Sequence, residues 1–98
     1  MTLEDIKQVA VPACRECKVQ RLDLCGALAR GEGTTARAVD LLVEFEAPEL
    51  HPSKRFFGLL HHLEDALSCE VDLLTVSSLS NPYVRRRVLK ERVNIYGG

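Results

Sequence analysis

Two apolar segments, residues 39–45 and 70–76, each carry an aspartate near their start, and they constrain the fold more than any other feature. In the first segment every second residue from 39 to 45 is apolar, and Asp40 and Glu44 lie at positions between them. This alternation predicts a β-strand with one fully apolar face. The second segment, Glu-Val-Asp-Leu-Leu-Thr-Val, also predicts a strand. Since both strands are otherwise apolar, Asp40 and Asp72 are candidates for a functional role.

Helix patterns separate the strand patterns along the chain. Between the two strands, apolar residues at the spacing of one helix face predict a helix from a Ser53 cap to about Leu67. The other predicted elements are a helix from Thr2 that Pro12 interrupts or ends, strands at 19–25 and 93–96, one helical turn at 27–30, and a helix from Asn81-Pro82 to about Arg92. Strict alternation in the 19–25 strand would place Val19 on the face of Asp23. This order favours an α/β fold, a small mixed β-sheet flanked by helices, and we expect one domain over residues 1–98.

The composition is that of an ordinary globular protein, with 98 residues, 46% hydrophobic and 28% charged, and a formal net charge of −1. A near-neutral charge gives no reason to expect direct nucleic-acid binding. No apolar run approaches the roughly 18 residues of a membrane span, and the charged N-terminus does not resemble a secretory signal. We therefore expect a cytoplasmic protein with no membrane partner. The charge is uneven, because residues 82–98 contain five basic side chains and one acidic one.

A spaced motif follows the first predicted strand. Gly26 and Ala27 come first, ten residues run from Leu28 to Arg37, and Ala38-Val39-Asp40 begins the next strand. This arrangement resembles the signature of the minimal nucleotidyltransferases of the polymerase-β-like superfamily, which reads Gly-Ser, ten residues, then Asp-x-Asp. The later Val71-Asp72-Leu73 is similar to the strand that carries the family's third aspartate. The resemblance covers nearly the whole chain, and the alternative is an unrelated α/β domain with coincidental aspartates.

The resemblance implies transfer of a nucleotide from ATP or another triphosphate to a protein or other hydroxyl acceptor, with Mg²⁺ as cofactor. Side chains at positions i and i+2 of a strand share a face, so paired aspartates reach the same ions, and Mg²⁺ prefers carboxylate oxygens. By this resemblance Asp40 and Asp72 are the candidate catalytic and metal-binding residues. The candidate nucleotide-binding residues surround a turn where backbone amides can approach a phosphate, and they are Gly26, Ala27, Arg30 and Gly31.

Two residues depart from the signature. Ala27 lacks the family's serine hydroxyl, and Ala38 lacks its first carboxylate. Loss of one phosphate contact costs about 1–2 kcal/mol, whereas a methyl group coordinates no ion, so Ala38 predicts impaired catalysis. Glu44 cannot replace the carboxylate, because four strand residues place it roughly 13 Å beyond Asp40. The other acidic residues near the signature are Asp23, within a strand, and Glu32, in a loop.

Two functions remain open at this point. One is nucleotidyl transfer, impaired by Ala27 and Ala38, and the other is a non-catalytic, antitoxin-like role as the binding partner of a helical HEPN-type toxin, which the resemblance also implies. Arg85 to Arg87 are either an interaction surface or the solvated face of the last helix. Arg37 adds positive charge beside the phosphate site or is only exposed.

The cysteines and histidines do not predict a second metal site. The pair Cys14-x-x-Cys17 has no second pair to complete a zinc site, so free thiols are expected. His61 and His62 are adjacent in a predicted helix, where neighbouring side chains point about 100° apart and do not chelate together.

Overall fold

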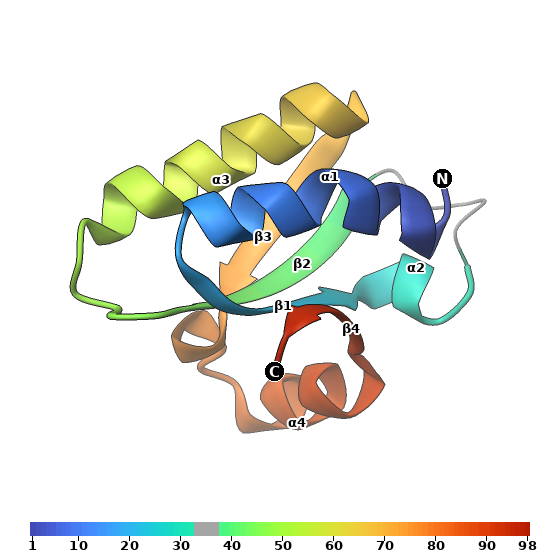
Figure 1. The fold of residues 1–98 in the computed structure, drawn as a ribbon. Helices are drawn as coiled ribbons and strands as arrows, with labels where there is room; N and C mark the ends of the chain where they lie inside the picture. The colour runs from blue at the N-terminus through green and yellow to red at the C-terminus, as the bar shows by residue number, and fades with distance from the viewer. Residues whose placement is uncertain (33–37) are drawn as a thin grey trace.

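The strands form one mixed sheet in the order β3-β2-β1-β4 (Figure 1). The computed structural model describes residues 1–32 and 38–98. Within these ranges the elements are α1 (Leu3–Glu16), β1 (Val19–Cys25), α2 (Gly26–Ala29), β2 (Ala38–Phe45), α3 (Pro52–Leu67), β3 (Glu70–Thr75), the 3₁₀ turn η2 (Val76–Ser78), α4 (Pro82–Glu91) and β4 (Val93–Gly97). β1 is antiparallel to β2 and β4, whereas β2 and β3 are parallel and are connected through α3. The predicted α/β fold with a small mixed sheet is confirmed.

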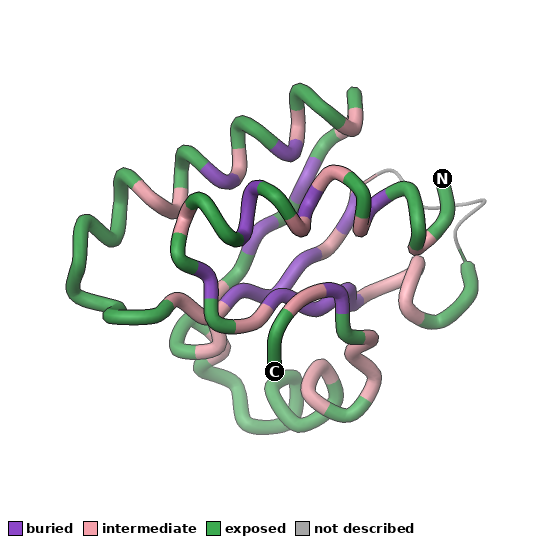
Figure 2. The backbone as a smooth tube through the Cα atoms, in the orientation of Figure 1, coloured by how far each residue is buried: buried purple, intermediate pink, exposed green. Residues whose placement is uncertain are grey.

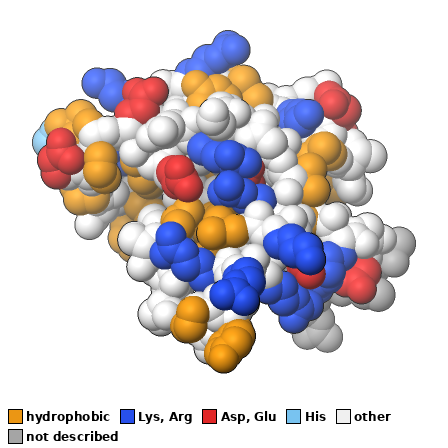
Figure 3. All heavy atoms as spheres, turned by 90° about the horizontal axis from the view of Figure 1, so that it is seen from below, with side chains coloured by type: hydrophobic (Ala, Val, Ile, Leu, Met, Phe, Trp, Pro, Cys, Tyr) orange, Lys and Arg blue, Asp and Glu red, His pale blue; other side chains and the backbone are white. Residues whose placement is uncertain are grey.

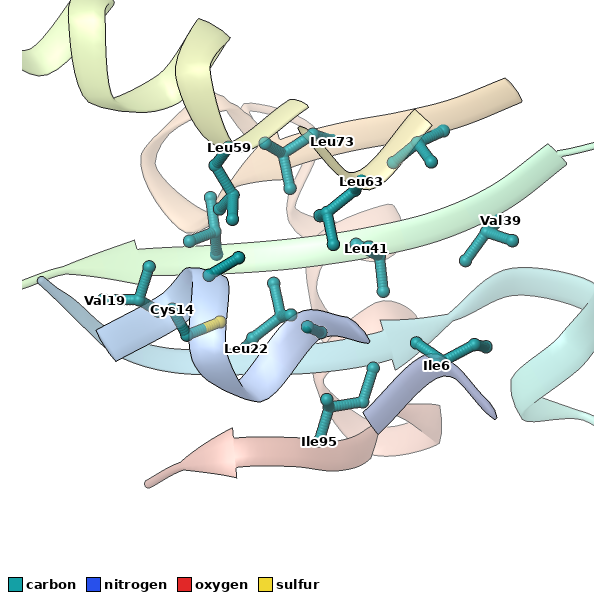
Figure 4. Packing of buried hydrophobic residues seen from close by; sticks show 14 of the residues in the cluster. Ile6, Cys14, Val19, Leu22, Val39, Leu41, Leu59, Leu63, Leu73 and Ile95 are labelled. Carbon is teal, nitrogen blue, oxygen red and sulfur yellow. The ribbon is translucent and has the colours of Figure 1, made fainter. Parts of the chain in front are cut away.

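Helices cover the two faces of the sheet unequally. α1 and α3 lie on one face and α4 lies on the other (Figure 1). Buried positions follow the sheet and the inner sides of α1 and α3, while α4 contains no buried residue (Figure 2). The core therefore lies between the sheet and the first two long helices (Figure 4), and its fully buried members include Ile6, Leu22, Leu41, Leu59 and Leu63.

The helix α1 is held by its cap and by its buried face. Thr2 and Asp5 form the predicted capping box, in which each side chain accepts a hydrogen bond from the other residue's backbone N–H. The expected interruption at Pro12 is wrong, because the helix continues to Glu16. Pro12 is exposed, and its missing N–H is outweighed by the packing of the opposite face, where Ile6, Ala10, Ala13 and Cys14 are buried.

Two local predictions need correction, and two are confirmed. The cap of α3 is His51, in a left-handed conformation, and Pro52 takes the first helical position, so Ser53 already lies inside the helix. In β1, an irregularity between Val19 and Arg21 shifts the register, so Val19 joins the core instead of sharing a face with Asp23. The Asn81 cap of α4 and the terminal strand β4 are as predicted. Across the described residues, no helix is long and apolar enough to cross a membrane.

Candidate functional site

The turn from β1 into α2 brings the backbone against the carboxylate of Asp40. Gly26 begins α2 with φ of +69°, a conformation that L side chains rarely adopt. A Cβ atom at this position would collide with the Asp40 carboxylate. Gly26 is therefore required for both backbone conformation and close approach, and it places the predicted phosphate-binding turn directly beside Asp40.

Gly31 offers a matched control for this requirement. It has a similar φ of +80°, but a Cβ there would meet no atom within 4 Å. We expect Gly31→Ala to lower the free energy of unfolding by about 1–2 kcal/mol, the cost of a left-handed Ala. Gly26→Ala should cost at least about 1 kcal/mol more, because Asp40 must also move. Urea unfolding measures both, and equal losses in the two variants would contradict the contact with Asp40.

Asp40 and Asp72 lie directly opposite each other on the parallel strands β2 and β3. Neighbouring strands are about 4.8 Å apart and opposite residues point to the same face, so the two carboxylates lie on one face of the sheet. Burial, together with hydrogen bonding to Asp72 and repulsion by it, raises the pKa of Asp40, while the positive charge of Arg30 lowers it. The structure thus brings together the two predicted metal ligands.

The raised pKa of Asp40 predicts a specific dependence of stability on pH in the absence of divalent ions. Above the folded-state pKa the ionised carboxylate is disfavoured in the folded protein relative to the unfolded one. This penalty is relieved as the pH falls through the folded-state pKa towards the ordinary aspartate pKa of 3.8. Asp40→Asn should therefore raise the free energy of unfolding at neutral pH and reduce the gain on acidification.

Urea unfolding at neutral and mildly acidic pH, with Asp65→Asn on the exposed side of α3 as control, tests this prediction. A loss of stability in Asp40→Asn at neutral pH would contradict it.

Among the described residues, no third carboxylate completes the pair formed by Asp40 and Asp72. Ala38 is two residues from Asp40 on the same strand, and its partner in register is Glu70 on β3. Sequence reasoning missed Glu70, because only the register between β2 and β3 places it opposite Ala38 on the face of Asp72. The Glu70 side chain is exposed. Across residues 1–32 and 38–98, no three His, Cys, Asp or Glu side chains converge in a group that could hold a metal ion.

Asp23 lies on the same sheet face as Cys25, and Cys25 is paired with Asp40 on β2. The Asp23 carboxylate is nevertheless bonded to other residues. Asp23 is 1% exposed. Arg21 Nε donates to both of its oxygens at 2.8 and 3.1 Å, and Arg92 Nη1 and Asn94 Nδ2 donate at 3.4 and 3.2 Å. Asp23 therefore ties β1 to β4 and to the end of α4, and it is not an alternative metal ligand.

The other two acidic candidates are also engaged elsewhere. Glu32 pairs with Arg30 at 3.1 Å. Glu44 points to the same face as Asp40, but it lies 4.0 Å from Arg92 Nη1, further along β2. The prediction that Glu44 does not replace the missing carboxylate fits this arrangement.

Arg30 connects the turn to α4. Its Nη1 lies 3.5 Å from Glu91, which also pairs with Arg87 at 3.4 Å. Because Arg30 lowers the pKa of Asp40, its positive charge acts on the carboxylate pair. Ala27 is half-buried inside α2, and Gly31 is exposed at the end of the turn. Arg37 lies outside the described residues, as does the end of the ten-residue segment that precedes Ala38.

The cysteines are free thiols, as expected. Burial raises the pKa of Cys14 to about 12. Burial, followed by the charges of Asp40 and Asp23, raises the pKa of Cys25 to about 11, so this thiol next to the carboxylate pair is protonated at neutral pH. His61 and His62 are exposed on α3.

The chain is similar in sequence and fold to known proteins. The family model described as a nucleotidyltransferase domain matches residues 6–95. Protein adenylyltransferase MntA of Thermococcus cleftensis is 32% identical over 99 residues, which cover 97% of each chain. A structure solved for a minimal nucleotidyltransferase is 30% identical and superimposes with a TM-score of 0.78 over 95% of each chain.

A more distant structure shares the fold. It contains a tri-AMPylated HEPN toxin of Shewanella oneidensis in complex with an MNT antitoxin, and it matches with a TM-score of 0.70 at 20% identity, covering 99% of this chain and 74% of the matched chain.

Proposed function

This chain belongs to the nucleotidyltransferase family, and we propose that it binds a nucleoside triphosphate at the Gly26 turn while catalysing nucleotide transfer poorly or not at all. Its physiological role is then that of an antitoxin-like protein that binds a helical HEPN-type partner. The observation that carries the proposal is Ala38. It leaves Asp40 and Asp72 facing each other without the family's first carboxylate.

The two carboxylates of Asp40 and Asp72 suit one divalent ion better than two. Mg²⁺ is commonly held by one or two carboxylates together with phosphate oxygens of the substrate, and Asp40 and Asp72 meet that requirement. When bound, such an ion neutralises negative charge on the triphosphate. A second ion would need a carboxylate at residue 38, where a methyl group stands. Without that second ion, the attacking and leaving oxygens would not both be stabilised, and transfer would be slow.

The remaining groups at the site serve binding. The backbone of the Gly26 turn lies beside the carboxylate pair, and small residues there let a phosphate approach closely. Arg30 supplies positive charge next to that position. Ala27 removes one hydroxyl, at a cost of about 1–2 kcal/mol in binding. We therefore expect the chain to bind a nucleotide although it catalyses transfer poorly. ATP is the expected nucleotide, because the relative MntA is a protein adenylyltransferase.

The HEPN-type partner is inferred from the related antitoxins. An MNT antitoxin with the same fold is bound to a HEPN toxin in a solved complex. Whether the partner is modified or only bound separates the two functions that the sequence left open. The missing carboxylate favours binding alone.

A transfer assay tests the proposal. The chain is incubated with α-labelled ATP, with Mg²⁺ or Mn²⁺, alone and with a HEPN-type protein as acceptor. We expect no labelled protein, while binding of a fluorescent ATP analogue is saturable and weakened by Arg30→Ala. Robust labelling that disappears in Asp40→Ala would overturn the impaired-catalysis proposal, and absent nucleotide binding would overturn the nucleotide site.

A further inference from the structure

An open groove of about 740 Å³ lies at the far end of β2 from the carboxylate pair. Its floor is formed where β2 and β3 end, at Phe45 and Thr75. The first turns of α3 form one wall and Arg85 of α4 forms part of the other. Asp40 is five residues from Phe45, about 17 Å along a strand. A partner in this groove would therefore leave the nucleotide site open.

The groove is apolar and aromatic. Its apolar lining includes Phe45, Phe56, Phe57, Val76, Pro48 and Pro52. Phe57 is 52% exposed although it packs edge-to-face on Phe56, with ring centroids 5.3 Å apart. Large apolar side chains grouped in a concave, exposed place are typical of protein interaction sites.

Hydrogen bonds within the chain order the groove wall that contains Pro48, without a partner. Arg55 donates hydrogen bonds to the backbone carbonyls of Leu50 at 2.6 Å, Ala47 at 2.6 Å and Glu46 at 2.7 Å. These bonds hold the loop between β2 and α3 against the first turn of α3. A preformed wall lowers the entropy cost of binding.

Positive charge borders the apolar surface. Figure 3, which views the molecule from the α4 side, shows Lys and Arg side chains gathered with hydrophobic side chains beside them. Arg87 pairs with Glu91, but within the described part of the chain neither Arg85 nor Arg86 forms an ion pair. A partner that carries carboxylates next to an apolar side chain would complement both features.

We propose that this groove binds an acidic segment of the partner protein, which inserts a bulky apolar side chain between Phe57 and Val76 and places a carboxylate on Arg85. This inference depends on the proposed function in one respect, namely that the chain binds a protein partner. RNA fits less well, because Arg85 is the one basic side chain among the described residues that line the groove, whereas a phosphate backbone is bound by several. Glu44 in the lining pairs with Arg92 at 4.0 Å, while Arg85 forms no ion pair within the described residues, so a carboxylate placed on Arg85 is compatible with the lining.

The test is an NMR titration of the whole ¹⁵N-labelled chain with the peptide acetyl-Glu-Glu-Leu-Phe-Glu-Glu-amide. We expect shifts at Phe57, Val76 and Arg85 but not at Gly26 or Gly31. Arg85→Glu should weaken binding at least about fivefold. Arg86→Glu, whose neighbouring helical position points about 100° away from that of Arg85, should weaken it less than twofold.

Phe57→Ser provides a second variant, with little risk to folding because half of the side chain is exposed. It should also weaken peptide binding at least about fivefold. The proposal is overturned if the peptide shifts no groove residue, if the Lys-containing version of the peptide binds equally well, or if a short oligouridine shifts the groove residues instead. A separate titration with a non-hydrolysable ATP analogue reports on the nucleotide site, so failure of the groove and failure of the proposed function are distinguishable.

Discussion

Replacing Ala38 with Asp and Ala27 with Ser is expected to tighten Mn²⁺ binding by about 10- to 100-fold in the presence of a non-hydrolysable ATP analogue. Ala38 lies two residues before Asp40 on the same face of β2, so an aspartate there reaches ions held by Asp40 and Asp72. The serine adds one hydroxyl donor to the nucleotide phosphates. Isothermal titration calorimetry of Mn²⁺ into the nucleotide complex measures the change.

Two further variants make this result specific. Ala66→Asp, at an exposed position of α3 outside the signature, adds the same charge and should tighten Mn²⁺ binding less than threefold. Ala38→Asp combined with Asp72→Asn should lose most of the gain, because two of the three carboxylates then remain. An unchanged Mn²⁺ affinity in the double substitution would mean that the metal site lies elsewhere.

Asp23→Ala should lower the free energy of unfolding by about 2–4 kcal/mol, because four hydrogen bonds to a buried carboxylate are lost and the guanidinium groups of Arg21 and Arg92 are left without it. The side chains of these arginines are 28% and 22% exposed, so water recovers part of their solvation. Each kcal/mol lowers Tm by roughly 4–8 °C in a domain of this size. Urea and thermal unfolding followed by circular dichroism measure the loss.

Glu44→Ala is the matched control, since Glu44 lies on the same sheet face and contacts Arg92 only at 4.0 Å. Its effect should stay within about 0.5 kcal/mol. Asp23→Asn, which keeps the shape and some acceptor capacity, should fall between the two. A loss in Asp23→Ala no larger than that of Glu44→Ala would contradict the role of Asp23 in holding β4 and the end of α4.

The order of elements was predictable because it depends on local patterns. Alternating apolar residues in 39–45, the Thr2 and Asn81 caps, and the Gly26 turn each follow from a few neighbouring residues. Pro12 and Ser53 were misjudged because tertiary packing and Pro52 outweighed the local preference. The shifted register at Val19 also depends on how β1 pairs with its neighbours, which no local pattern reports.

The site was predictable in its residue types but not in its contacts. The resemblance placed Asp40 and Asp72 near each other, and the structure adds that they lie in the same register. The position of Glu70 opposite Ala38 and the burial of Asp23 among Arg21, Arg92 and Asn94 arise from pairing between distant segments. The groove at Phe57 likewise joins α3, α4 and two strand ends, so only the folded chain reveals it.

Counting the Mn²⁺ ions bound per chain, by electron paramagnetic resonance with a saturating non-hydrolysable ATP analogue, tests the central claim most directly. The missing carboxylate at residue 38 predicts one ion in this chain and two in the Ala38→Asp, Ala27→Ser variant. Two ions in the unaltered chain would contradict the claim. If Glu70→Gln then removed one of them, Glu70 would be the carboxylate that replaces the one missing at residue 38.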